Sequence, residues 1–174
     1  MTRTLKVLLL AACIAPAGGF AAHANDGEFL GSLEGNWAGK GTVKVRTNSD
    51  PINVNCTFST DTSDTSLSLD GKCRGLVIVS RAISADLTAS GTSYKGSYTG
   101  AGTGVAGLSG TRSGTRSGDA INLGIRWAKE VNGDRAAQMT VEKVGENGLR
   151  LTTVDEDPTS GERVVTSRID LRRT

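Results

Sequence analysis

The glycine-rich run at residues 99–119 has residue types and spacing that could bind phosphate. The stretch from Gly102 to Gly107 fits the Gly-x-Gly-x-x-Gly fingerprint of dinucleotide sites, and two Ser-Gly-Thr-Arg copies follow, which supply Arg112 and Arg116. The fingerprint works between a strand and a helix, because the first amides of the helix face the pyrophosphate. Strand-like sequence follows here instead. We therefore expect a curved, glycine-rich strand pair or a mobile flap, with Arg112 and Arg116 as a candidate anion or partner contact.

The absence of histidine after residue 24 excludes most of the catalytic and metal-binding sites that we considered. The single histidine, His23, falls within the expected leader at residues 1–24. Ser-His-Asp and Cys-His nucleophile systems need an imidazole, as do histidine-ligated zinc and haem sites. The acidic clusters at 61–64 and 155–157 lie in apparent turns, where short polar side chains bind the backbone. We therefore expect a protein that is not an enzyme and that holds no metal or cofactor.

The first 24 residues have the layout of a secretory signal peptide. Two basic residues precede an apolar run, and small residues before the cleavage point favour cleavage after Ala24. The stretch from Leu10 to Cys13 also fits a bacterial lipobox, so a lipoprotein anchored at Cys13 is the alternative. We expect residues 1–24 to be a signal peptide and residues 25–174 to form one domain, in the periplasm or secreted.

The net charge of the chain that remains after cleavage limits the kinds of partner that it can attract. Cleavage removes two of the 20 basic residues and none of the 18 acidic ones, which leaves 18 of each. A neutral chain has no overall attraction for nucleic acid or anionic lipid. No second long apolar run follows the leader, so no membrane span is expected. The expected partner is a small apolar molecule or lipid, or another envelope or extracellular protein.

Apolar and polar residues alternate through most of the remaining chain, which is typical of half-buried strands. The alternation is clearest at residues 52–58, 67–73 and 121–127, and turn-forming residues separate these segments. Residues 75–87 are expected to form one long strand, and only residues 26–35 suggest a helical turn. The pattern predicts an all-β domain: a single antiparallel β-barrel of about eight to ten strands, with a β-sandwich as the alternative.

Two cysteines remain after the leader, Cys56 and Cys73. An even pair in an exported chain is most simply a disulfide. If the intervening hairpin turns at residues 64–65, Cys56 lies opposite Cys73 and Phe58 faces Gly71. Both cysteines then fall on the apolar face of the hairpin. The hydrophobic pattern and the covalent pairing thus predict the same register.

Residues 30–43 resemble the opening of a lipocalin or calycin-type barrel, including the nitrobindin-like barrels. Gly35-x-Trp37, after a short helical or turn segment, carries the resemblance. It implies that Trp37 packs at the closed end of a cup under a basic residue of the last strand, here Arg168 or Arg172. It also implies an interior that takes a small apolar molecule. Nitrobindin-like barrels bind haem through a histidine, so haem binding is not carried over to the processed chain.

Two functions remain open at this point. The first is an exported, non-catalytic binding protein of the bacterial envelope, whose calycin-like barrel takes a small apolar ligand or lipid. Its candidate ligand-binding side chains are Trp37, Phe58, Tyr94, Tyr98 and Trp127. The alternative is a protein-interaction or envelope-integrity module, or a hydrolase inhibitor, with no small ligand. That role would need a rigid exposed loop, for which residues 109–119 and 155–162 are the candidates.

Overall fold

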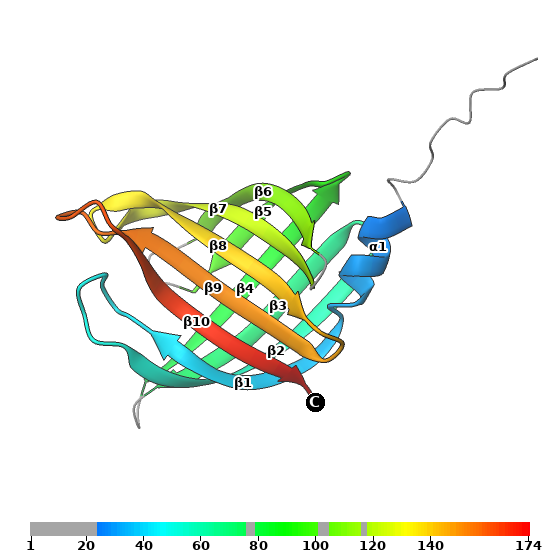
Figure 1. Cartoon of the computed structure of the whole chain (residues 1–174), viewed down its shortest axis with the longest axis horizontal. Coiled ribbons are helices and arrows are strands. Elements are labelled where there is room, and N and C mark those ends of the chain that lie inside the picture. The colour runs from blue at the N-terminus through cyan, green and yellow to red at the C-terminus, as the bar shows by residue number, and fades with distance from the viewer. Residues whose placement is uncertain (1–23, 76–78, 101–104, 116–117) are drawn as a thin grey trace, which may run out of the picture.

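The computed structural model shows a closed barrel of ten antiparallel strands with one short helix (Figure 1). It describes residues 24–75, 79–100, 105–115 and 118–174. Each strand pairs with its neighbours in the chain, and β1 pairs with β10 to close the barrel. The elements are α1 Ala24–Gly31, β1 Gly35–Val43, β2 Ile52–Ser63, β3 Ser66–Gly75, β4 Val79–Ser90, β5 Ser93–Thr99, β6 Val105–Thr115, β7 Gly118–Val131, β8 Asp134–Val144, β9 Gly148–Glu156 and β10 Arg163–Arg173. The predicted barrel is confirmed, and the alternative sandwich is wrong.

The register of the β2–β3 hairpin follows the prediction. Cys56 pairs with Cys73 and Phe58 with Gly71, and the two cysteines form a disulfide. β2 ends at Ser63 and β3 begins at Ser66, so the hairpin turns at the expected residues. Apolar side chains at alternate positions of β2 are buried while the polar ones between them are exposed. The period-two pattern therefore defines the inside and outside of the barrel.

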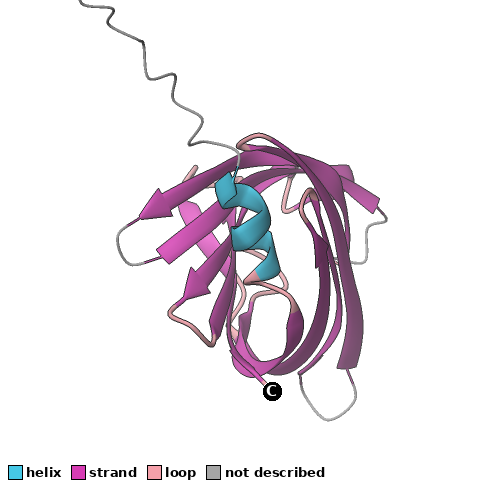
Figure 2. Cartoon of the chain, turned by 90° about the vertical axis from the view of Figure 1, so that its right-hand side faces the viewer, coloured by secondary structure: helices cyan, strands magenta, loops and turns pink. Residues whose placement is uncertain are grey.

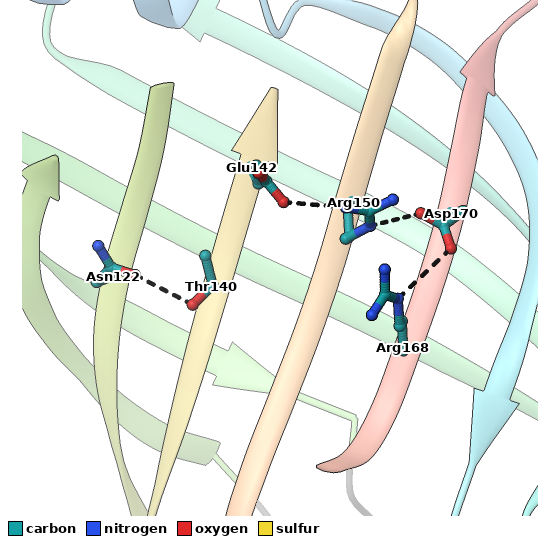
Figure 3. Close-up of polar contacts among 6 residues, drawn as sticks. All are labelled: Asn122, Thr140, Glu142, Arg150, Arg168 and Asp170. Atoms are coloured by element: carbon teal, nitrogen blue, oxygen red, sulfur yellow. Dashed lines mark hydrogen bonds and ion pairs between the residues drawn. The ribbon is translucent and has the colours of Figure 1, made fainter. Parts of the chain in front are cut away.

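Polar side chains form short ladders on the outer face of β7 to β10 (Figure 3). Arg150 of β9 lies between Glu142 and Asp170, with nitrogen–oxygen distances of 3.4 and 2.6 Å. Thr140 of β8 donates a hydrogen bond of 3.1 Å to the side chain of Asn122 in β7. Exposed pairs of this kind add little stability. Their main consequence is a polar outer face on strands whose inner face is apolar.

The expected long strand at residues 75–87 is wrong. β3 ends at Gly75, β4 begins at Val79, and these two residues pair with each other, so a hairpin divides the segment. Residues 76–78, which lie outside the described part of the chain, are Leu-Val-Ile and contain none of the residues that usually mark a turn. The hydrophobic pattern therefore ran through the hairpin without a break.

Most of the glycine-rich run forms β6, which pairs with β5 and β7. A Cβ atom on Gly110 would lie 1.9 Å from the carbonyl oxygen of Asn122, so glycine is needed where these strands approach closely. No helix follows the run, and the prediction of a glycine-rich strand pair is confirmed. Arg112 belongs to β6 and pairs with Ile121 of β7. Arg116 lies outside the described residues.

The two ends of the barrel differ. At one end α1 lies across the opening (Figure 2), and Phe29, Leu30 and Leu33 are buried there. The hairpin turns at 132–133 and 157–162 lie at the other end, which we call the mouth (Figure 1). Within the described residues, no helix is both long and apolar enough to cross a bilayer. The strands thus enclose an interior that α1 covers on one side.

Candidate functional site

Trp37 is the anchor of the end that α1 covers. Its side chain is 1% exposed, and its indole Nε1 donates to the carbonyl oxygen of Leu33 at 3.1 Å and to Oγ1 of Thr60 at 3.0 Å. Because buried polar groups need partners, these bonds orient the ring beneath the helix–strand connection. Trp37 therefore closes this end, as the resemblance to calycin-type barrels implies.

The basic residue of the last strand that lies above Trp37 is Arg173, and the expectation of Arg168 or Arg172 was wrong. The guanidinium carbon of Arg173 lies 4.3 Å from the centroid of the Trp37 ring, within cation–π range. Arg173 is the residue that pairs with Trp37 across β1 and β10. Arg172 is exposed, and Arg168 lies 3.8 Å from Asp170 on the outer face. The pairing register between β1 and β10 therefore determines which of the three arginines lies over Trp37.

A cavity of about 420 Å³ occupies the barrel interior on the mouth side. This volume falls within the roughly 300–1,000 Å³ of small-molecule sites. Most of its wall is aliphatic or aromatic, and the wall includes Val54, Phe58, Leu69, Ile83, Leu87, Leu108, Leu123, Met139, Val141, Leu151 and Ile169. The exposed side chains of Val45 and Arg81 also belong to its lining, so the cavity reaches the surface at the mouth.

The aromatic side chains proposed from the sequence divide between the two ends. Phe58, Tyr98 and Trp127 line the cavity, and the Tyr98 and Trp127 rings meet edge to face with centroids 5.8 Å apart. Trp37 and Tyr94 are each 1% exposed and are not part of the cavity lining. Three of the five candidates therefore lie where an interior ligand would contact them.

Asp155 is a carboxylate in the apolar cavity wall. It is 5% exposed, and Oγ1 of the buried Thr166 donates to its Oδ2, while Oδ1 has no hydrogen-bond partner. Burial raises the pKa of Asp155, the charge of Asp134 raises it further, and the bond from Thr166 opposes this. A buried acid with a raised pKa is a marker of functional sites.

Sequence reasoning missed Asp155. We expected the acidic cluster 155–157 to lie in a solvated turn, and for Asp155 this was wrong. It belongs to β9, where Leu149, Leu151 and Asp155 share the inward-facing set of alternate positions. The signal that identifies it is the period-two pattern itself, extended two residues further into the acidic cluster.

Trp127 brings a second polar atom to the wall of the cavity. Its side chain is 4% exposed, and its indole Nε1 has no hydrogen-bond partner. Lys44, Arg81 and Asn132 add polar side chains at the mouth. Burial also raises the pKa of Tyr98.

Among the described residues, no three His, Cys, Asp or Glu side chains are grouped closely enough to hold a metal ion.

A hydrogen-bonded turn at residues 157–162 lies beside the mouth. Oδ1 of Asp157 accepts hydrogen bonds of 3.0 Å from the backbone amides of Thr159 and Ser160, and Oδ2 accepts one of 2.7 Å from Thr47. The hydrogen bond from Thr47, with those from the turn, lowers the pKa of Asp157. The part of the candidate loop 155–162 that follows β9 is therefore held by hydrogen bonds within the turn and to Thr47. The other candidate, residues 109–119, belongs mainly to β6 and β7.

Comparison with known proteins identifies the fold of the chain. No protein-family model matches it. No curated protein matches it either. The chain has the fold of Rv2717c from M. tuberculosis. The crystal structure of Rv2717c superposes with a TM-score of 0.69 and 15% sequence identity, over 86% of this chain and 98% of that one. At this identity the similarity concerns the barrel alone, and membership of a lipocalin or nitrobindin-like family stays a prediction.

Proposed function

We propose that this protein is a non-catalytic binding protein whose barrel takes a small, mainly apolar ligand through the mouth. The observation that carries the proposal is the cavity of about 420 Å³ with its apolar wall. Each square ångström of apolar surface removed from water contributes about 25 cal/mol to binding before the costs of association. A preformed cavity keeps those costs low, because the wall is already ordered.

Export is part of the proposal. The Cys56–Cys73 disulfide supports an oxidising compartment, since such bonds persist outside the cytosol. The leader at residues 1–24 supports the same compartment, with cleavage after Ala24 and lipidation at Cys13 as the two routes of processing. The protein would then work in the periplasm or outside the cell, either free or held at a membrane by a lipid.

A protein-interaction role is the second candidate, and the turn organised by Asp157 favours it. This turn is exposed at the mouth and is held to the 44–51 loop through Thr47. A preorganised loop loses little conformational freedom on binding, as the recognition loop of an inhibitor requires. In this role the partner would be another envelope or extracellular protein, and the cavity would have no ligand of its own.

Native mass spectrometry of protein purified without detergent from its own cells tests the first candidate. We expect a discrete adduct in the native spectrum that disappears on denaturation. Ala85→Phe should abolish the adduct, because Ala85 is buried and lines the cavity. Ala82→Phe is the matched control, since Ala82 is exposed on the same strand. A bare wild-type protein, or an adduct that survives Ala85→Phe, would contradict the interior site and favour the protein-interaction role.

A further inference from the structure

We propose that the cavity selects ligands whose polar head donates a hydrogen bond, an alcohol or a protonated amine, and that Asp155 accepts this bond. The inference rests on the proposed function and adds the chemical class of the ligand. Two kinds of observation carry it. Two residues of a mainly apolar wall, Asp155 and Trp127, have buried polar atoms without partners, and irregularities in two strand pairs occur near these residues.

Oδ1 of Asp155 is the acceptor. A buried acceptor without a partner costs about 1–3 kcal/mol, and more when the group is charged. Thr166 satisfies Oδ2 only, which leaves Oδ1 buried and unpaired in a residue that lines the cavity. The terminal torsion of a carboxyl group is soft, so a small rotation that keeps Oδ2 on Thr166 would bring Oδ1 to a donor in the cavity at little cost. A ligand that donates to Oδ1 removes the penalty that the folded protein carries.

A β-bulge holds the carboxyl group of Asp155 in this arrangement. The register between β9 and β10 shifts between Val165 and Ser167, so Thr166 is an extra residue without a partner in β9. Thr166 is 6% exposed, and its side chain reaches Asp155 inside the barrel. Bulges re-aim side chains and are frequent beside functional sites. Here the bulge provides the donor that fixes one oxygen of Asp155 and leaves the other available.

Trp127 lies at a second irregularity at the same end of the barrel. The register between β7 and β8 shifts between Arg126 and Val131. Arg135 donates to the carbonyl oxygens of Trp127 and Ala128 at 3.1 and 3.0 Å, and so partners backbone oxygens in the irregular stretch. The indole Nε1 remains a donor without a partner. An alcohol suits both groups, because its O–H group can donate to Asp155 and its oxygen can accept from Trp127.

A carboxylate head group is the main competitor. Arg81 and Lys44 line the mouth and would attract it, but Arg81 is exposed, so its ion pair is weak, and Nζ of Lys44 already donates to the carbonyl oxygen of Thr47 at 3.2 Å. Deeper in the cavity the carboxylate would meet Asp155, which already lies in the field of Asp134. The surroundings of Asp155 therefore favour a hydrogen-bond donor over an anion. The experiment should compare ligands that differ in their head group.

Calorimetric titration with decanol, decylamine and decanoate tests the proposal, because these probes share one chain and differ only in the head. For the wild-type protein at neutral pH, we expect decanol or decylamine to bind at least tenfold more tightly than decanoate. Whichever of these two probes binds more tightly shows whether the site prefers an alcohol or a protonated amine. Asp155→Asn should remove this preference, since the amide oxygen takes the bond from Thr166 and its N–H groups face the cavity. Asp70→Asn changes an exposed aspartate on β3 and should leave all three affinities unchanged.

Trp127→Phe is a second variant that does not alter Asp155. It keeps an aromatic ring and removes the N–H donor, so it should weaken decanol several-fold more than it weakens decylamine, which has no acceptor for that donor. Equal binding of the three probes, unaffected by Asp155→Asn, would overturn the head-group inference and leave the apolar site intact. Tight binding of decanoate would overturn it in favour of an anion site, and loss of that binding in Arg81→Ala or Lys44→Ala would locate this site at the mouth. Failure of every probe to bind would overturn both this inference and the proposed function.

Discussion

Asp155 and Thr166 form a polar pair inside a wall of aliphatic and aromatic side chains. Both are buried, and both face the cavity from the mouth ends of β9 and β10. A buried carboxylate destabilises a fold unless its partners compensate for the lost hydration. The pair therefore has the character of a functional group retained at a cost in stability.

The pH dependence of stability reports this cost. Burial raises the pKa of Asp155 above its ordinary value of 3.8, so the folded protein holds the proton to a higher pH than the unfolded chain does. The stability from this proton is complete below the unfolded pKa and is lost as the pH rises through the folded pKa. Asp155→Asn cannot titrate, so its unfolding free energy should rise relative to the wild type between acidic and neutral pH. Urea unfolding of both proteins at a series of pH values measures this, and parallel pH profiles would contradict it.

At this scale the residue types were easier to predict than their surroundings. Phe58, Tyr98 and Trp127 follow from being aromatic and, for Phe58 and Trp127, from the alternation of their strands. The burial of Asp155 could not be predicted in this way, because two further acids and a proline follow it, and this composition is typical of turns. Its burial depends on how far β9 continues, which pairing with β8 and β10 decides. That information lies in the partner strands and not in the local sequence.

Glycines in β6 show how an element is adapted to a closed barrel. Gly110 lies where the backbone of β7 approaches closely, whereas a Cβ atom on Gly107 would meet nothing within 4 Å. Close packing of the strands thus requires glycine at Gly110, which lies outside the fingerprint-like spacing, and does not require it at Gly107, the last glycine of that spacing. The two glycines form a matched pair for mutation, because they lie on the same strand and differ in the space around them.

Gly110→Ala should destabilise the protein by about 1–3 kcal/mol, because its Cβ would lie 1.9 Å from the backbone oxygen of Asn122 and one of the strands must move. Gly107→Ala should change the stability by no more than about 0.5 kcal/mol. Chemical denaturation of both variants measures the difference. Equal effects of the two substitutions would show that β6 and β7 are not held at this separation.

The cover over the closed end gives a second prediction for an element. Arg173 donates to the carbonyl oxygens of Ser32, at 2.8 Å, and Glu34, and stacks on Trp37. Arg173→Ala should lower the melting temperature through a loss of about 1 kcal/mol. Arg172→Ala, a substitution at the exposed neighbouring residue, is the control and should have little effect. If both variants melt alike, Arg173 does not fasten the segment that follows α1.

Strand elements were predicted well where the inside and the outside differ in polarity. The β2–β3 hairpin was predicted in register, because alternation and the Cys56–Cys73 pair constrain it independently. The division between β3 and β4 was missed, since apolar residues fill the connection. The bulge at Thr166 was missed as well, because a bulge is a relation between two strands and leaves no mark on the polarity of one.

The whole molecule is a barrel with two unlike ends, one covered by α1 and Trp37 and the other leading into the cavity. Alternation predicts that such strands bury one face, but closure depends on pairing β1 with β10 at opposite ends of the domain. The cavity depends in turn on the sum of the interior side chains from all ten strands. The alternation thus predicts the strands and the class of fold, whereas the register of closure and the shape of the cavity follow from how all ten strands assemble.

The two tryptophans make this asymmetry measurable, because Trp127 lines the cavity and Trp37 lies at the closed end. A nitrogen–proton correlation spectrum of the labelled protein, recorded while decanol is added, follows one indole N–H signal at each end. We predict that the Trp127 signal shifts with saturation while the Trp37 signal stays in place. Two unmoved signals, or equal shifts of both, would contradict an interior binding site reached through the mouth.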